Sequence, residues 1–140
     1  MRDTNAVQLI HSWDEEEIAN LYRAGGWWKD EYHVEELRHL IRGSFLFAVA
    51  IDEQTGKAIG MGRVLSDGVS DAYIQDLVVL PEFRKSGIGS QIISLLVKTC
   101  RDKGLTWIAL IAEPDSDPFY SSLGFKKMIG YVPMLFQEEF

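Results

Sequence analysis

The chain has 140 residues, 46% hydrophobic and 25% charged, which indicates one globular domain over residues 1–140 and excludes two full-sized domains. Its formal net charge of −7 argues against general nucleic-acid binding and against adhesion to an anionic membrane, and it favours cationic small molecules as partners. There is no apolar run of the length of a signal peptide or membrane span, and the single cysteine, Cys100, fits a reducing compartment, so we expect a cytoplasmic protein.

The first half of the chain begins with a short apolar run at 6–10. A helix is then predicted to start at the acidic stretch Asp14–Glu17, because acids in a first turn suit the positive end of the helix dipole. Gly25 and Gly26 end this helix, and Trp27 and Trp28 lie in the loop that follows. The helical spacing of Val34, Leu37 and Ile41 predicts a second helix, which stops at Gly43.

The middle of the chain predicts a β-hairpin with strands at 45–51 and 58–65. The pattern then changes to a strand at 72–80, a helix at 88–103 and a strand at 107–112. Such a strand–helix–strand unit implies that its two strands run parallel. The sequence therefore predicts an α/β domain with a mixed sheet.

The C-terminal part predicts one short helix at 117–123. Asp117 is suited to cap it, Pro118 to its first turn and Gly124 to a left-handed stop. The tail at 126–140 holds two further β-prone runs.

The segment between the predicted strand at 72–80 and the following helix is the most informative part of the sequence. A basic pair, Arg84 and Lys85, precedes two glycines, Gly87 and Gly89, that open the helix. Glycines let backbone N–H groups approach an anion, and a helix N-terminus supplies unpaired donors, so the segment predicts a diphosphate site. The third glycine of a dinucleotide-binding fingerprint is absent, as is the Gly-Lys-Ser/Thr of a P-loop. A plain tight turn is the alternative.

These residues resemble a known family. The run from Arg84 to Gly89 matches the Arg/Gln-x-x-Gly-x-Gly/Ala motif of the GNAT superfamily of acetyl-CoA-dependent N-acetyltransferases. The strand at 74–81 and the run at 119–125, similar to the family's Phe-Tyr-x-x-Leu-Gly-Phe helix, extend the resemblance over nearly the whole chain. It implies the GNAT fold, a mixed and mostly antiparallel sheet flanked by helices, in which the strand before the motif and its successor splay to admit acetyl-CoA.

The resemblance also implies which residues bind the acetyl-CoA donor. The strand before the motif would pair with the pantetheine arm and polarise the thioester carbonyl, through Leu77, Val78 and Val79. Backbone N–H groups of the loop would hold the pyrophosphate, through Arg84, Lys85, Ser86, Gly87, Ile88, Gly89 and Ser90.

Tyr120 matches the family's tyrosine that protonates the leaving sulfur. It lies in the first turn of its predicted helix, where the dipole would help a phenol give up its proton. The alternative is a packing role beside Phe119 and Phe125. The direct transfer that the family mostly uses needs no covalent enzyme intermediate.

Two carboxylates, Asp76 and Glu113, are the candidate bases. Strand alternation places Asp76 on the face of Ile74 and Val78, where burial would raise its pKa. The alternative is a structural hydrogen bond to a neighbouring loop. Tyr73 occupies the position of the glutamate base of histone-type relatives, which argues against histones as substrates and leaves a water chain as a further option.

The acceptor pocket is expected in the first half of the chain. Trp27 and Trp28 would form an aromatic wall for an amine, or else a lid or core cover, and Asp67 would orient a cation or simply form a turn. The three histidines lack metal-ligand spacing, so no metal is expected. The favoured acceptor is a small primary amine; the alternatives are a peptide or lysine acceptor and a non-catalytic acyl-CoA-binding module. The tail at 132–140 would suit an interface strand in a homodimer.

Overall fold

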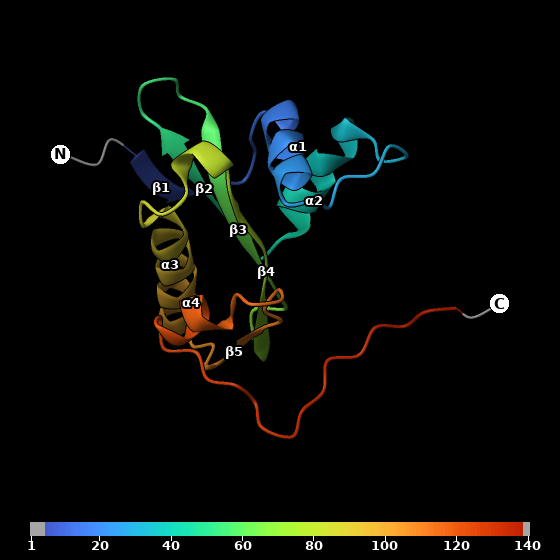
Figure 1. The fold of residues 1–140 in the computed structure, drawn as a ribbon, viewed down its shortest axis with the longest axis vertical. Coiled ribbons are helices and arrows are strands. Elements are labelled where there is room, and N and C mark those ends of the chain that lie inside the picture. The colour runs from blue at the N-terminus through green and yellow to red at the C-terminus, as the bar shows by residue number, and fades with distance from the viewer. Residues whose placement is uncertain (1–4, 139–140) are drawn as a thin grey trace. The chain divides into compact units, whose positions relative to one another are not determined.

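The computed structural model describes residues 5–138 and groups them into two compact units, one through Leu110 and one from Ile111 (Figure 1). The prediction of one domain over residues 1–140 stays a prediction.

The first unit contains a five-stranded sheet with the strands in chain order from β1 to β5 (Figure 1). Neighbours among the first four strands are antiparallel, and β5 runs parallel to β4. This confirms the predicted mixed and mostly antiparallel sheet. The strands are β1 (Asn5–Leu9), β2 (Leu46–Asp52), β3 (Ala58–Ser66), β4 (Asp71–Val79) and β5 (Trp107–Leu110).

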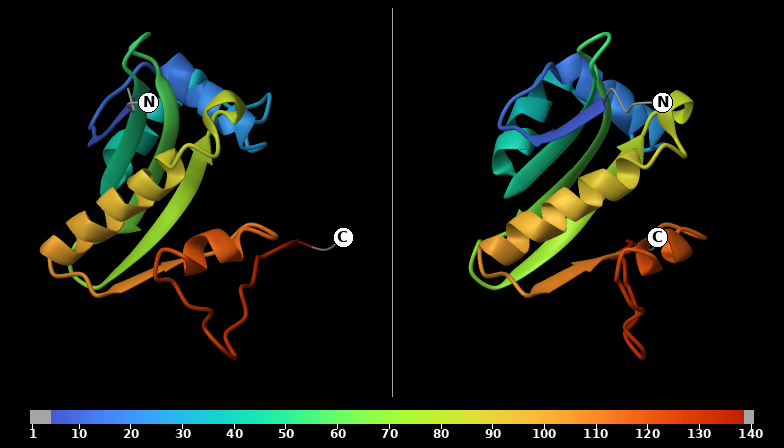
Figure 2. Two further views of the ribbon diagram at one scale, coloured as in Figure 1. Left: turned by 60° about the vertical axis from the view of Figure 1, so that its left-hand side comes forward. Right: turned by 90° about the vertical axis from the view of Figure 1, so that its left-hand side faces the viewer.

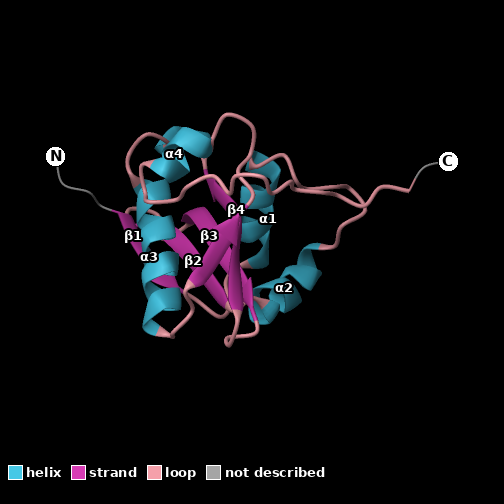
Figure 3. Ribbon diagram, turned by 90° about the horizontal axis from the view of Figure 1, so that it is seen from below, coloured by secondary structure: helices cyan, strands magenta, loops and turns pink. Residues whose placement is uncertain are grey.

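Helices cover both faces of this sheet, with α3 on one side and α1 and α2 on the other (Figures 2 and 3). The bounds are Glu15–Ala24 for α1, Leu37–Gly43 for α2, which the short helix η1 (Val34–Glu36) precedes, and Ile88–Asp102 for α3. The Asp14 carboxylate caps α1 by accepting a 3.0 Å hydrogen bond from the backbone N–H of Glu17, which satisfies one of the helix's free donors. The predicted start of this helix is therefore confirmed.

Each face of the sheet has its own apolar layer. Apolar side chains of α1 and α2, among them Leu21 and Ile41, pack with Met61 of β3 and Val78 of β4. On the other face, the buried stripe of α3 lies close against β3. A Cβ added at Gly62 would lie 2.9 Å from Cγ2 of Ile92, so glycine permits this close approach. Cys100 belongs to the same buried stripe.

A bulge interrupts β4 next to the predicted loop. Met61 pairs with Val78 while Arg63 pairs with Gln75, so two residues of β4 oppose one residue of β3. Asp76, one of the two, has a φ of 62°. Pairing between β4 and β5 ends at Ile74 and Leu110, so the C-terminal half of β4 has no partner in β5.

The bulge corrects the predicted face of Asp76. Its carboxylate reaches Tyr22 of α1, so it shares the face of Val78, which packs with the same helix. Ile74 pairs with Val64 on the opposite face, toward α3. The expected common face of Ile74, Asp76 and Val78 is therefore wrong for Ile74, because the extra residue at the bulge breaks the alternation.

The second unit contains one short helix, α4 (Asp117–Ser121). Ser116 precedes it as the N-cap, without a side-chain cap hydrogen bond, so the prediction that Asp117 caps the helix is wrong. Gly124 has the predicted left-handed backbone, with a φ of 102°.

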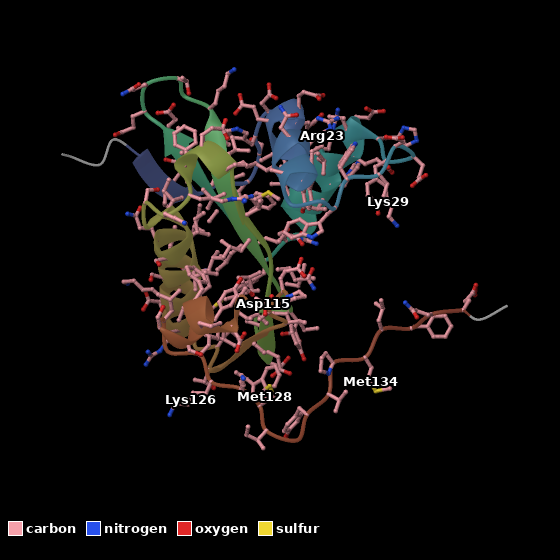
Figure 4. The ribbon with its side chains drawn as sticks, in the orientation of Figure 1. Arg23, Lys29, Asp115, Lys126, Met128 and Met134 are labelled. Carbon is pink, nitrogen blue, oxygen red and sulfur yellow. The ribbon has the colours of Figure 1, made fainter. Side chains whose placement is uncertain are left out.

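The β-prone runs expected in the tail form no strand within residues 126–138. Met128 and Met134 lie along this extended segment, where several large apolar side chains are exposed (Figure 4). A homodimer built on the tail stays a prediction.

Among residues 5–138, no helix is both long and apolar enough to span a bilayer.

Candidate active site

The segment between β4 and α3 has the backbone of an anion-binding loop. A single 3₁₀ turn, η2 (Pro81–Phe83), follows β4. Lys85 and Gly87 then adopt left-handed conformations, with φ values of 64° and 86°. Left-handed residues within such a turn direct backbone N–H groups into a concave surface that suits an anion. A Cβ added at Gly87 would meet open space, so this side of the loop is accessible to a ligand.

The start of α3 lacks a side-chain cap, because its N-cap residue is Gly87. The N–H groups in the first turn of a helix have no acceptor within the helix. In α3 these are the N–H groups of Ile88, Gly89 and Ser90. Because the helix dipole adds a partial positive charge, the site favours a phosphate or diphosphate group.

Side chains of the loop hold its backbone in place. Nε of Arg84 donates a 2.8 Å hydrogen bond to the carbonyl oxygen of Val79, and Oγ of Ser86 donates to the carbonyl oxygen of Phe83. Arg84 is therefore more than a charge at the rim, because it fastens the loop to the last residue of β4.

The loop continues directly from the part of β4 that has no partner in β5. Leu77, Val78 and Val79 belong to this part. An unpaired strand edge presents backbone N–H and C=O groups that an amide-containing arm can use. A diphosphate cradle joined to such an edge fits an elongated ligand with phosphate at one end and amides along its length. This is the chemistry of coenzyme A, so the residues present fit the predicted donor.

Comparison with known proteins now identifies the family. The model of the acetyltransferase (GNAT) family matches residues 8–125. The chain belongs to the GNAT family. The expected family and fold are thus confirmed.

Three similar proteins illustrate this GNAT membership. The uncharacterized N-acetyltransferase ycf52 of Pyropia yezoensis is 31% identical over 113 residues, which cover 79% of this chain and 64% of the relative. Serotonin N-acetyltransferase 2, chloroplastic, of Oryza sativa subsp. japonica is 40% identical over 70 residues, or 50% of this chain and 35% of the relative. The chain spans less than two thirds of the length of these relatives. A solved GNAT family acetyltransferase of Streptococcus pneumoniae TIGR4 has a TM-score of 0.80 at 25% identity, covering 96% of this chain and 98% of that one.

The carboxylate of Asp76 is already engaged in this GNAT domain. Its Oδ2 atom accepts a 2.7 Å hydrogen bond from the Tyr22 hydroxyl and another 2.7 Å bond from Nε of Arg63. The structure thus contains the structural hydrogen bonds that were the alternative to a base, although the partners come from α1 and β3 and not from a loop. Burial raises the pKa of Tyr22, and the neighbouring charge of Asp76 is the second largest cause.

Both tryptophans pack against the core under α1, but their other neighbours differ. The Trp27 ring lies edge-on to Tyr22, with centroids 6.1 Å apart. Trp28 has the guanidinium of Arg23 5.4 Å from its ring centroid. Figure 4 labels Arg23 on α1 and Lys29 in the loop that follows. The core-cover alternative therefore describes both tryptophans, and a cation already occupies one face of Trp28.

Asp67 lies in the turn between β3 and β4, at the opposite end of β4 from the glycine loop. Its Oδ1 atom accepts hydrogen bonds of 2.8 Å from the Val69 N–H and 2.9 Å from the Ser70 N–H. These hydrogen bonds hold the pKa of Asp67 below its ordinary value, and the one from Ser70 has the largest effect. The geometry is that of the turn-forming alternative.

Tyr120 and Glu113 both belong to the second unit. The Tyr120 ring contacts those of Phe119 and Phe125, with centroids 5.0 and 5.9 Å away. Burial raises the pKa of Tyr120, and the charge of Glu113 raises it further. Burial and this carboxylate thus oppose loss of the phenolic proton, whereas the helix dipole was expected to favour it, and the acid role of Tyr120 stays a prediction.

Sequence reasoning missed Tyr22 and Arg63 as partners of Asp76. Tyr22 is 54 positions from Asp76, and no local motif signals the contact. Among residues 5–138 no group of three or more histidine, cysteine or acidic side chains is arranged to hold a metal ion.

Proposed function

We propose that this chain is an N-acetyltransferase that transfers the acetyl group of acetyl-CoA directly to a primary amine of a small molecule. One observation carries the proposal: the uncapped, left-handed start of α3 at Gly87 follows the half of β4 that lacks a partner in β5. Membership of the GNAT family supplies the reaction class.

The residues of the first unit would bind and polarise the donor. Backbone N–H groups from Arg84 to Ser90 would hold the pyrophosphate of acetyl-CoA. The strand edge at Leu77–Val79 would align the pantetheine arm, and one of its N–H groups would stabilise negative charge on the thioester oxygen.

Proton transfer completes the reaction. An amine with a pKa of about 10.4 must first lose a proton, and we propose that Glu113 accepts it through water. The amine nitrogen then bonds to the carbonyl carbon as the carbon–sulfur bond breaks. Tyr120 would donate its phenolic proton to the departing sulfur, since its raised pKa keeps it protonated at neutral pH. The product nitrogen loses its second proton as the amide forms, and this proton would restore the Tyr120 phenol through water.

A small amine is the proposed acceptor for two reasons. The net charge of −7 favours a cationic substrate, and the guanidinium of Arg23, 5.4 Å from the Trp28 ring centroid, is an example of a cation held against that ring. In addition, one relative, from rice, is named for transfer to serotonin, a small amine.

Titration calorimetry with acetyl-CoA tests the donor site. The wild type should bind, and Gly87→Trp should abolish binding by filling the cradle. Gly56→Trp is the matched control, because Gly56 also has a positive φ, 74°, and open space around its Cβ, but lies in the turn between β2 and β3. Absence of binding by folded wild-type protein would overturn the proposal.

A thiol-release assay with a panel of amines then tests the reaction. Turnover with small amines supports the proposed acceptor class. Turnover with peptides alone, or tight donor binding without any turnover, would replace the proposal with one of the two alternatives.

A further inference from the structure

A polar cluster joins the bulge of β4 to α1 and β3. Oδ2 of Asp76 accepts hydrogen bonds from the Tyr22 hydroxyl and from Nε of Arg63, both 2.7 Å long. Arg63 extends the cluster through its other two nitrogens. They donate hydrogen bonds of 3.3 Å to Oγ of Ser44 and 3.4 Å to Oε1 of Gln75. One carboxylate thus joins residues of a helix and two strands that lie side by side (Figure 3).

The cluster is largely withdrawn from water. The side chains of Arg63 and Asp76 are 15% and 22% exposed, and Tyr22 is 8% exposed. Removing one partner of such a shielded charge pair leaves the other without compensation, and this is costly. The three groups therefore hold one another in a defined arrangement.

The backbone at Asp76 needs this support. A φ of 62° is unfavourable for a residue with a side chain, and such conformations persist where the surroundings hold them. The same residue opens the bulge, and the residues after it form the half of β4 without a partner in β5. Any change in the bulge would therefore shift the N–H groups of Leu77–Val79.

We propose that Asp76 is a positioning residue, fixed by Tyr22 and Arg63, that sets the conformation of the donor-binding edge Leu77–Val79. The inference rests on the proposed function and deepens it. In this role the carboxylate, held at Oδ2 by both hydrogen bonds, acts through geometry and not by accepting the proton of the amine.

Three substitutions at Asp76 separate geometry from proton transfer. Asp76→Asn keeps an acceptor oxygen and a residue type that tolerates positive φ. Asp76→Gly keeps the backbone freedom and loses the side chain, and Asp76→Ala loses both. The KM for acetyl-CoA should rise least for Asn, more for Gly and by about tenfold or more for Ala, the ratio expected for losing a short charge-assisted hydrogen bond. The pH profile of kcat should be unchanged in Asp76→Asn.

A base at this position gives a different result. Asp76→Asn would then lower kcat by about 10²-fold or more and remove the limb of the pH profile that belongs to the base, with little change in KM. This outcome would overturn the inference.

Tyr22→Phe tests the cluster from its other side. It should raise the KM for acetyl-CoA in the same direction as Asp76→Asn, and the double variant should change it by less than the product of the two single effects, because the residues share one hydrogen bond. Asp71→Asn is the matched control, since it alters an exposed side chain on β4 itself. Multiplicative effects in the double variant would overturn the inference.

Hydrogen exchange without ligand keeps the inference separate from the proposed function. Amide protection at residues 75–79 should fall in Asp76→Ala and be retained in Asp76→Asn and Asp71→Asn. If the wild type neither binds nor turns over acetyl-CoA, the proposed function fails, and exchange still decides the role of Asp76. Equal protection in all variants would overturn the inference while leaving the function intact.

Discussion

The Nε atom of Arg84 donates a 2.8 Å hydrogen bond to the carbonyl oxygen of Val79, so the start of the glycine loop closes back onto the end of β4. The donor edge and the diphosphate cradle are thereby fastened together by a single side chain. The family motif accepts either Arg or Gln at this position, and both residues carry an N–H donor. We infer that donation to the strand matters here more than charge.

Arg84→Gln and Arg84→Met test this role. Gln keeps a donor without the charge, and Met keeps a similar length without either. The Kd for acetyl-CoA, measured by calorimetry, should rise about threefold or less for Gln and about tenfold for Met, because a lost hydrogen bond is worth about 0.5–1.5 kcal/mol. Equal losses in both variants, with an equally reduced dependence on salt, would show that charge is what matters.

Gly62 should be intolerant of any side chain. A Cβ there would lie 2.9 Å from Cγ2 of Ile92 and 3.3 Å from Cδ1 of Leu96, both on the buried face of α3. Gly62→Ala should therefore lower the free energy of unfolding by about 1–3 kcal/mol, the usual range for overpacking a core. Urea denaturation measures the change.

Gly43→Ala is the matched control for Gly62. Gly43 is the last residue of α2, and a Cβ there meets nothing within 4 Å. Because alanine restricts the unfolded chain, this variant should be neutral or more stable by up to about 1 kcal/mol. Similar destabilisation of both variants would contradict the packing argument.

Elements defined by local patterns could be predicted well from the sequence. The strand predicted at 72–80 is β4 at Asp71–Val79, and the helix predicted at 88–103 is α3 at Ile88–Asp102. Both have a strong apolar period bounded by glycine or proline, and the glycine loop lies between them. Such signals act within a few residues, so they need no knowledge of the partners.

Features that depend on distant partners could not be predicted. The bulge at Asp76 arises from the register with β3 and from contacts with Tyr22 and Arg63, so alternation along β4 alone placed Asp76 wrongly with respect to Ile74. The prediction of β-prone runs in the tail failed for another reason. Residues with β propensity form a strand only where the edge of a sheet is available to pair with them. Propensity alone does not supply that edge.

Tyr120→Phe tests the proposed acid. Only the hydroxyl is removed, and the ring contacts with Phe119 and Phe125 remain, so the fold should persist. The value of kcat should fall by about 10²- to 10⁴-fold, the usual contribution of an acid catalyst, with little change in the KM for acetyl-CoA. Tyr131→Phe, at an exposed tyrosine of the same unit, is the control. An unchanged kcat would reduce Tyr120 to a packing residue.

The pH dependence of the wild type gives a second check on Tyr120. Its pKa is raised above the ordinary value of 10.0, so the phenol stays protonated up to that pH. An alkaline decline in kcat due to Tyr120 should therefore be centred above pH 10, and Tyr120→Phe should lower kcat by nearly the same factor at pH 7 and pH 9. A decline centred near pH 8 that disappears in Tyr120→Phe would contradict this assignment.

Asp67 should stabilise the fold in a pH-dependent way. Hydrogen bonds from the N–H groups of Ser70 and Val69 lower its pKa in the folded chain below the ordinary 3.8, whereas the unfolded chain keeps the ordinary value. The stabilisation is therefore complete above the ordinary value and is lost as the pH falls through the lowered folded value. Asp67→Asn should show a small decrease in Tm at pH 7 that shrinks toward pH 2.

Glu53→Gln, in the exposed turn between β2 and β3, controls for removal of one negative charge from a chain of net charge −7. A Tm difference for Asp67→Asn that persists unchanged at pH 2 would show that the carboxylate charge contributes nothing.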